Sequence, residues 1–215
     1  MQFGKDYFDY LKYSRKEQLI SSHISESLSW ASKLTGMNLL NGTEKSALDV
    51  GCALGYGVNL LRALGYDVLG TDVTSYSLLQ GKATTKENSF VACSAQNLPF
   101  NKKFDLVTCF EVLEHLERPA RALQNLYDFS SGVVLCTTPN KTFERIVKRI
   151  LKDFDKTHIN VKTPKEWQEL IRANLKCKFV KIQCFVDLSF QIGNASFYRS
   201  LKLPFGMETR ILICK

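Results

Sequence analysis

A glycine-containing segment between an apolar run and a helical run has the composition of a nucleotide-binding loop. The apolar residues 47–50 precede Gly51 and Gly55, and the helical run begins near residue 56. Glycines let the backbone approach a ligand closely, and a helix N-terminus offers free N–H groups. Asp72 stands 21 residues after Gly51, where a carboxylate can accept both hydrogen bonds of a ribose diol. The sequence therefore predicts a site for a ligand that contains a nucleoside.

The glycine spacing argues against a nicotinamide or flavin dinucleotide. The dinucleotide fingerprint is G-x-G-x-x-G. Starting at Gly51, its later positions are occupied by Ala53 and Tyr56, and starting at Gly55 its last position is Leu60. Both registers fail, so the nucleoside ligand is expected without a pyrophosphate loop.

A second set of residues could move a proton or bind a metal. Glu111, Glu114 and His115 have the spacing i, i+3 and i+4, which is one face if the segment is helical. His115 or His158 could accept the proton of a hydroxyl. Alternatively, these four residues could hold a divalent ion that lowers the pKa of that hydroxyl, or Glu114 and His115 could only brace the helix start. We take His115 and His158 as candidate catalytic residues; a divalent metal stays open but is not expected.

Four motifs within residues 45–140 resemble, in the right order, the class I S-adenosylmethionine-dependent methyltransferases. The motifs are Asp49-x-Gly51-x-Ala53-x-Gly55, Thr71-Asp72-Val73, residues 95–100 (AQNLPF) and residues 104–116 (FDLVTCFEVLEHL). The resemblance implies an α/β, Rossmann-like fold, with a seven-stranded sheet whose last strand is antiparallel and helices on both faces. It also implies S-adenosylmethionine as the cofactor and S-adenosylhomocysteine as its product. The Glu-x-x-Glu-His segment is similar to that of ubiquinone-biosynthesis O-methyltransferases and small-RNA 2′-O-methyltransferases, groups in which metal dependence occurs.

The resemblance also implies roles for individual residues. Gly51 and Gly55 would line the methionine and ribose, with Asp49 shaping the loop. Asp72 would hold the ribose hydroxyls, and Val73 would flank the adenine. The complete set of residues expected to bind the cofactor is Asp49, Gly51, Cys52, Ala53, Gly55, Asp72, Val73, Ser94, Ala95, Gln96, Phe110 and Glu111.

Two positions depart from the pattern of the family. Ala53 stands where the family usually has glycine, so its methyl group must be tolerated in the loop. Ser94 stands where an aspartate often meets the adenine amino group, and a serine accepts that bond more weakly. These departures predict reduced affinity for the cofactor rather than loss of the site.

The segment after the fourth expected strand bears on the methyl acceptor. Amino-directed nucleic-acid methylases of this fold carry an Asn/Asp-Pro-Pro-aromatic turn there, whereas this chain has Phe110-Glu111-Val112. None of the five prolines precedes a cysteine, so a cytosine-C5 nucleophile is also excluded. We expect a small-molecule acceptor, methylated on oxygen, and no DNA. An RNA methyltransferase and a non-catalytic binding protein of the same fold remain the alternatives.

Alternation of short β-type runs with helical runs predicts βαβ units and a parallel sheet. Strands are expected at 47–50, 67–71, 90–93, 104–109, 132–137, 178–186 and 208–214, the last two antiparallel to each other. Helices are expected at 15–34, 56–64, 75–83, 119–128, 141–152 and 164–174. We expect a single domain over 1–215. Its parts are an N-terminal helical cap (1–40), a cofactor-binding core (41–140), and acceptor-side helices with a C-terminal β-hairpin (141–215).

The composition is that of a soluble globular protein with an excess of cations. Of the 215 residues, 45% are hydrophobic and 23% charged, which excludes a disordered chain. The seven cysteines include no C-x-x-C pair and are expected to be reduced core thiols. No signal peptide or membrane span is expected, so the expected location is the cytoplasm, with contact at the periphery of a membrane as the alternative.

The basic excess is concentrated in one region. The net charge is +8 for the chain, and residues 141–181 alone hold 12 Lys and Arg against 5 Asp and Glu. At 100° per residue, residues 141–152 form an amphipathic helix with cations on one side and Phe143, Ile146, Val147, Ile150 and Leu151 on the other. The helix could pack its apolar face on the domain or lie on an anionic membrane. The charge also favours an acceptor that is anionic or lipid-like.

Aromatic residues outside the core are candidates for the acceptor pocket. They lie among residues 1–30 and in an expected connection over residues 188–205, and the stretch Thr157-His158-Ile159-Asn160 is a further candidate part of the pocket. That connection contains Phe190, Phe197, Tyr198 and Phe205. Packing of the cap helices would explain the same aromatics.

Overall fold

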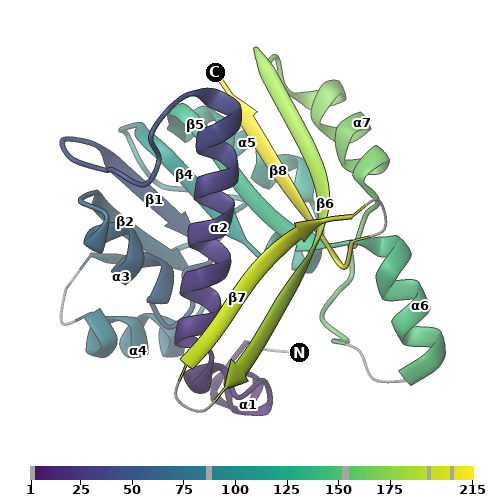
Figure 1. Cartoon of the computed structure of the whole chain (residues 1–215). Helices are drawn as coiled ribbons and strands as arrows, with labels where there is room; N and C mark the ends of the chain where they lie inside the picture. The colour runs from purple at the N-terminus through teal and green to yellow at the C-terminus, as the bar shows by residue number, and fades with distance from the viewer. Residues whose placement is uncertain (1–2, 86–88, 152–154, 193–194, 204–205) are drawn as a thin grey trace.

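The computed structural model describes residues 3–85, 89–151, 155–192, 195–203 and 206–215. Within these residues, eight strands form one sheet with helices on both faces (Figure 1). The strands are β1 (Ser46–Val50), β2 (Asp67–Asp72), β3 (Phe90–Ala92), β4 (Phe104–Phe110), β5 (Ser130–Pro139), β6 (Phe179–Ile192), β7 (Ala195–Lys202) and β8 (Glu208–Cys214). Their order across the sheet is β3-β2-β1-β4-β5-β8-β6-β7.

The sheet is parallel from β3 to β5 and antiparallel beyond. β1 pairs with β2 and β4, β2 pairs with β3, and β4 pairs with β5, all in parallel. β8 lies between β5 and β6 and is antiparallel to both, and β7 is antiparallel to β6. The predicted Rossmann-like sheet with an antiparallel last strand is confirmed. So is the antiparallel pairing of the last two predicted strands, which form β6 and β8.

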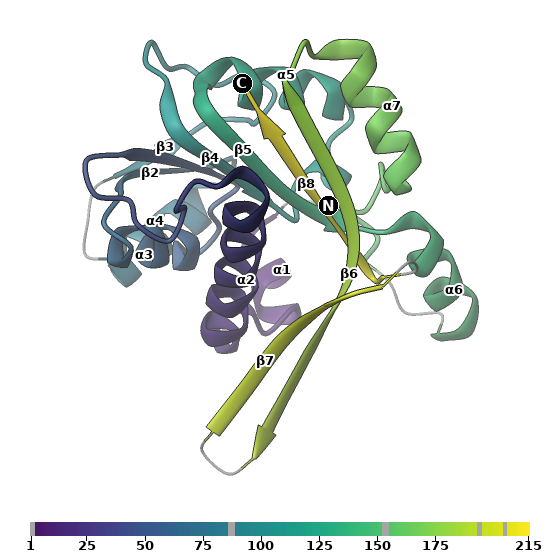
Figure 2. The same cartoon turned by 45° about the horizontal axis from the view of Figure 1, so that its top comes forward.

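The predicted number of strands, seven, is too low. In place of the expected connection over residues 188–205, β6 continues to Ile192 and β7 pairs with it. The register runs from Phe185 opposite Lys202 to Ile192 opposite Ala195. In the sequence, these two segments are separated by Gly193-Asn194, residue types that favour a tight hairpin turn. Figure 2 shows this β6–β7 hairpin extending beyond the rest of the sheet.

Two helical layers cover the two faces of the sheet. The helices are α1 (Lys5–Tyr10), α2 (Glu17–Thr35), α3 (Tyr56–Ala63), α4 (Ser75–Thr85), α5 (Pro119–Phe129), α6 (Lys141–Leu151) and α7 (Pro164–Asn174), with 3₁₀ helices η1 (Tyr13–Arg15) and η2 (Leu113–His115). α2 and α3 bury Leu28 and Leu61 against one face of the sheet. α5 and α7 bury Leu126 and Trp167 against the other face.

The parallel strands bring their carboxyl ends to the same edge of the sheet. The central strands are nearly continuous in apolar, buried residues, as strands covered on both faces must be. The residues that follow β1, β2, β4 and β5 therefore gather at one edge, where ligands bind in open α/β sheets. The functional residues predicted from the sequence come mainly from these loops.

The region predicted as an N-terminal cap, residues 1–40, has two parts. α2 belongs to the helical layer on the sheet and ends at Gly36, whose φ is +73°. α1 and η1 lie instead over the loop that follows β1, where Phe8 packs with Ala53, Leu54 and Tyr56. The first turns of the chain therefore cover the glycine loop.

α6 projects at the margin of the molecule, away from the sheet (Figures 1 and 2). Lys152 and Phe205 lie outside the described residues, as do the side chains of Ile150, Leu151, Phe190 and Phe197. None of the described helices is long and apolar enough to cross a membrane. All seven cysteines are free, as predicted.

Candidate functional site

The loop between β1 and α3 holds three residues in the left-handed region. Gly51, Ala53 and Gly55 have φ values of +78°, +46° and +83°. A Cβ atom on Gly51 would lie 2.2 Å from Cγ2 of Val112, so only glycine allows this loop to approach the segment after β4. Ala53 accepts the left-handed conformation with its methyl group buried, at a cost of about 1 kcal/mol.

Two buried carboxylates hold this loop. The Asp72 Oδ2 atom accepts a hydrogen bond from the Ala53 N–H at 3.0 Å, and its Oδ1 atom accepts one from the Thr74 N–H at 3.0 Å. Asp49 lies beneath the loop and accepts a bond from the Thr108 hydroxyl at 2.8 Å. Burial raises the pKa of Asp49 to about 6. The Thr74 hydroxyl also donates to Oδ1 of Asp72, at 3.2 Å, so only Oδ2 keeps a lone pair with which it could accept another donor.

The remaining predicted cofactor residues lie along the same edge. Val73 is 63% exposed, whereas Cys52 and Ala95 are buried. The Ser94 hydroxyl accepts a bond from the Gln96 N–H at 3.2 Å. The Gln96 side chain in turn accepts one from the Arg118 N–H at 3.1 Å, next to the start of α5. Only the backbone groups of Cys52 and Ala95 could therefore meet a ligand.

Tyr13, in η1, also lies at this site and was not predicted as part of it. Its ring stacks on Tyr56, with centroids 5.9 Å apart and planes 8° apart. Burial raises the pKa of Tyr13, and the carboxylates of Asp49 and Asp72 raise it further. The phenol of Tyr13 therefore stays neutral beside the two carboxylates that hold the loop.

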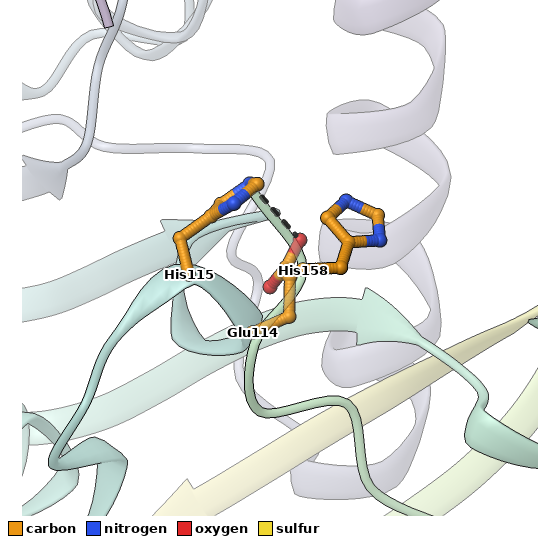
Figure 3. A group of neighbouring side chains, drawn as sticks. All are labelled: Glu114, His115 and His158. Atoms are coloured by element: carbon orange, nitrogen blue, oxygen red, sulfur yellow. Dashed lines mark ion pairs between the residues drawn. The ribbon is translucent and has the colours of Figure 1, made fainter. Parts of the chain in front are cut away.

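The predicted catalytic histidines lie together with Glu114 (Figure 3). Glu114 and His115 belong to η2, and His158 lies in the segment between α6 and α7. The rings of His115 and His158 have their centroids 4.9 Å apart, and Nε2 of His115 is 3.7 Å from Oε1 of Glu114. One ligand atom from each of the three residues lies within 4.8 Å of the others. We call this group the Glu114 cluster.

The Glu114 carboxylate is fully buried and its charge is poorly compensated. Neither of its oxygens has a hydrogen-bond partner within the described residues. Burial raises the pKa of Glu114 well above its usual range, and the nearby Glu111 raises it further. A carboxylate in this environment must either hold a proton or face a cation. The donor set of one carboxylate and two imidazoles fits a divalent transition metal.

Hydrogen bonds orient His115. Its Nδ1 atom lies 3.2 Å from the carbonyl oxygen of Thr157 and 2.9 Å from the hydroxyl of the same residue. An Nδ1–H that donates to this carbonyl leaves Nε2 without a proton, which is the form that a base requires. Burial lowers the pKa of His115, and the neighbouring His158 lowers it further. His115 is therefore a neutral imidazole at neutral pH, with Nε2 free of a proton.

The prediction that residues 111–115 form one helical face is wrong. η2 spans only Leu113–His115, and Glu111 precedes it with a φ of +53°. Burial of its carboxyl group raises the pKa of Glu111 to about 7, and this carboxyl group also interacts with that of Glu114. The Glu111 carboxylate lies within 4.8 Å of ligand atoms of His23 and Glu208 as well.

Sequence analysis also missed the residues that connect the Glu114 cluster to the N-terminus. The Tyr7 hydroxyl donates to Asp155 at 2.9 Å, and Asp155 accepts from the backbone N–H of Thr157 at 2.8 Å. The ring of Phe3 packs edge-on against His115 at 5.2 Å. No spacing in the sequence indicates these contacts, because they join residues about 110 to 150 positions apart.

Comparison with known proteins places this architecture in a family. A family model described as a methyltransferase domain matches residues 26–175. The chain belongs to the methyltransferase domain family. A ubiquinone biosynthesis O-methyltransferase of Histophilus somni is 31% identical over 161 residues, which are 63% of this chain and 66% of that protein. The protein of the same name from Rickettsia canadensis is 31% identical over 100 residues, 44% of this chain and 42% of that protein. The chain thus covers less than two thirds of these relatives.

Solved structures of methyltransferases share the fold along nearly the whole chain. A magnesium protoporphyrin IX methyltransferase of Synechocystis, with bound S-adenosylhomocysteine, has a TM-score of 0.67 at 16% identity; the match covers 99% of this chain and 96% of that one. A methyltransferase of Archaeoglobus fulgidus that depends on S-adenosylmethionine has a TM-score of 0.70 at 18% identity, covering 97% and 99%. These likenesses show that the chain shares the fold of these methyltransferases.

Proposed function

We propose that the chain transfers the methyl group of S-adenosylmethionine to an oxygen atom of a small molecule. The observation that carries this proposal is the β1–α3 loop, held by Asp72 in a left-handed conformation, in a chain of the methyltransferase domain family. The names of the relatives, which specify O-methylation in ubiquinone biosynthesis, support an oxygen as the acceptor atom.

In this proposal the loop residues hold the cofactor. Gly51 and Gly55 line its methionine and ribose, with Asp49 beneath them. The free lone pair on Oδ2 of Asp72 accepts a ribose hydroxyl, and the other ribose hydroxyl displaces the Thr74 hydroxyl from Oδ1. The exposed side chain of Val73 flanks the adenine, and Ser94 accepts a bond from the adenine amino group. The backbones of Cys52, Ala53, Ala95 and Gln96, with Phe110 and Glu111 after β4, complete the site.

Methyl transfer is an in-line displacement on an activated carbon. The acceptor oxygen attacks the methyl carbon, the bond between sulfur and carbon breaks, and the products are a methyl ether and S-adenosylhomocysteine. Positioning supplies most of the rate, up to about 7–11 kcal/mol. The acceptor hydroxyl must lose its proton, and the unprotonated Nε2 of His115 is the group that we propose to accept it. His158, which packs on His115, keeps the pKa of His115 low.

A divalent cation is the alternative use of the Glu114 cluster. Glu114, His115 and His158 would hold it, and the unpartnered oxygens of Glu114 fit that role. When bound, such an ion acts as a Lewis acid that lowers the pKa of an acceptor hydroxyl. His115 and His158 would then orient the ion instead of accepting the proton.

Ligand binding tests the proposal directly. S-adenosylhomocysteine at about 100 times its Kd should raise the melting temperature by about 5–10 °C, since it contributes about 2.7 kcal/mol to a protein of this size. NAD at the same concentration should change nothing. Incubation with radiolabelled S-adenosylmethionine and a panel of phenols and catechols then tests methyl transfer. Stabilisation by NAD alone would overturn the proposal.

We further propose that α6 binds an anionic membrane surface at its periphery. α6 meets the domain through polar residues: Glu144 lies 3.5 Å from His158, and the Lys141 ammonium lies 2.6 Å from the Glu166 carboxylate. Ile146 lies about 140° around the helix from Lys141 and is 50% exposed. None of the α6 residues with described side chains is buried. The described part of the apolar face of α6, Phe143, Ile146 and Val147, is therefore available to a lipid surface.

A basic cavity beside α6 supports the same partner. It has a volume of about 590 Å³. It is lined by Lys141, Thr142, Arg145, Ile146, Arg149, Thr163 and Glu166. Arg145 and Arg149 are exposed, and their guanidinium groups suit phosphate. Lys141 is already paired with Glu166, so the two arginines would carry the attraction to anionic headgroups.

Vesicle flotation tests the contact with a membrane. The chain should float with vesicles that contain phosphatidylglycerol, and the double substitution Arg145→Glu and Arg149→Glu should reduce the bound fraction at least 10-fold, because each cation near such a surface contributes about 1 kcal/mol. The double substitution Lys33→Glu and Lys82→Glu changes the net charge equally on exposed positions of α2 and α4 and should have little effect. Equal binding to neutral and anionic vesicles would contradict the proposal.

A further inference from the structure

A second group of side chains that could bind a metal consists of His23, Glu111 and Glu208. Of these three residues, only Glu111 has a role in the proposed reaction. His23 projects from α2, Glu111 follows β4, and Glu208 begins β8. One ligand atom from each of these residues lies within 4.8 Å of the other two. The three elements are far apart in the sequence. The fold thus brings one imidazole and two carboxylates to one point.

The ring of His23 is fixed in place before any ion could bind. Its Nδ1 atom lies 2.7 Å from Oδ2 of Asp187, and its Nε2 atom lies 3.1 Å from the hydroxyl of Thr137. The Tyr198 hydroxyl is also 3.3 Å from Nδ1. Histidines that bind metals usually donate their other ring N–H to a carboxylate, which sets the tautomer and the ring orientation. The contact between Nδ1 of His23 and Asp187 has this form, which leaves Nε2, whose partner is the neutral hydroxyl of Thr137, as the nitrogen that an ion would meet.

The charges around His23 are unequal. Three carboxylates, those of Glu111, Asp187 and Glu208, lie close to His23, and one of them, Asp187, also faces the guanidinium of Arg210. The Arg210 Nη2 atom lies 3.9 Å from Asp187, while its Nε–H donates to Ser27 at 3.0 Å. Oε2 of Glu208 is 3.5 Å from Nδ1 of His23 and has no hydrogen-bond partner within the described residues. A cation between Glu111 and Glu208 would balance this charge.

We propose that His23, Glu111 and Glu208 bind a divalent transition-metal ion at a site separate from the Glu114 cluster. One nitrogen and two carboxylate oxygens suit Mn²⁺ or Zn²⁺ better than Ca²⁺, which takes six to eight oxygens. The ion would join α2 to the end of β4 and the start of β8, and so tie the helix that carries His23 to the edge of the sheet where the acceptor is proposed to bind. The site shares Glu111 with the proposed cofactor site, whereas His23 and Glu208 have no role in the proposed methyl transfer.

The test counts ions bound by the whole chain. After chelation and dialysis, the protein is titrated with Mn²⁺ alone, and free Mn²⁺ is followed by its paramagnetic resonance signal. Glu208→Gln and His23→Gln should each weaken one class of Mn²⁺ site at least 10-fold, since the loss of one ligand from such a site has an effect of this size or larger. His158→Asn should leave that class unchanged. Glu169→Gln, which removes an exposed carboxylate on α7, is the control and should bind Mn²⁺ as the wild type does.

The folding of the variants is checked without metal. Glu208→Gln removes one of three clustered carboxylates and conserves the shape of the side chain, so its melting temperature without metal should equal or exceed that of the wild type. Addition of Mn²⁺ should then raise the melting temperature of the wild type more than that of Glu208→Gln. The proposal is overturned if the wild type binds no Mn²⁺, or if Glu208→Gln and His23→Gln bind Mn²⁺ as tightly as the wild type does.

Discussion

Gly51→Ala should weaken the binding of S-adenosylhomocysteine by about 100-fold, which corresponds to about 3 kcal/mol. The new Cβ atom would lie 2.2 Å from Cγ2 of Val112, and the residue has a φ of +78°, which is costly for alanine. The loop must then move away from the segment after β4, and the N–H groups that would face the cofactor move with it. Isothermal titration calorimetry with S-adenosylhomocysteine measures this change.

Two further variants separate the effect of the contact from that of backbone strain. Gly36→Ala, at the end of α2, has a similar φ of +73° and no atom within 4 Å of its Cβ position. It should reduce stability by about 1 kcal/mol and leave binding unchanged. Val112→Ala removes the atom that Gly51→Ala would strike, so the double variant should recover part of the affinity. If Gly51→Ala alone binds within about 3-fold of the wild type, the loop is not the cofactor site.

His115→Asn should lower kcat about 100- to 1,000-fold with the best acceptor of the phenol panel, because general-base catalysis contributes a factor of this size. The base acts unprotonated, so activity should fall as the pH drops through the pKa of His115. That pKa is lowered by burial and by His158, and thus lies below 6.5. His158→Asn removes one of these causes and should shift the acidic limb of the pH profile to higher pH.

Chelation distinguishes the two uses of the Glu114 cluster. If EDTA abolishes activity and Mn²⁺ restores it in the wild type and also in Glu208→Gln, the two histidines act as metal ligands and the base proposal fails. If EDTA has no effect, the metal alternative fails. Glu169→Gln, on the exposed side of α7, should behave as the wild type does with and without EDTA. A wild-type kcat in His115→Asn would remove this residue from the mechanism.

Local patterns in the sequence were sufficient to predict most of the elements. Short, nearly continuous apolar runs between helical runs predicted β1, β2, β4 and β5 within a few residues of their bounds, because strands covered on both faces must be apolar. α7 begins at Pro164, as predicted, and its Thr163 and Glu166 form a capping box. The sequence analysis missed β7 because it took residues 188–205 as a long connection, although Gly193-Asn194 is a pair that favours a tight hairpin turn.

The sequence by itself determined the family and the residues of the glycine loop, because both depend on short spacings. Only the tertiary structure decided which acidic residues and histidines lie together. Glu111 and Glu114 are three positions apart, yet Glu111 groups with His23 and Glu208, whereas Glu114 groups with His115 and His158. Contacts between residues 23, 111 and 208 arise when α2 packs across the sheet and β8 inserts between β5 and β6. Local spacing carries no information about such contacts, because packing of distant elements determines them.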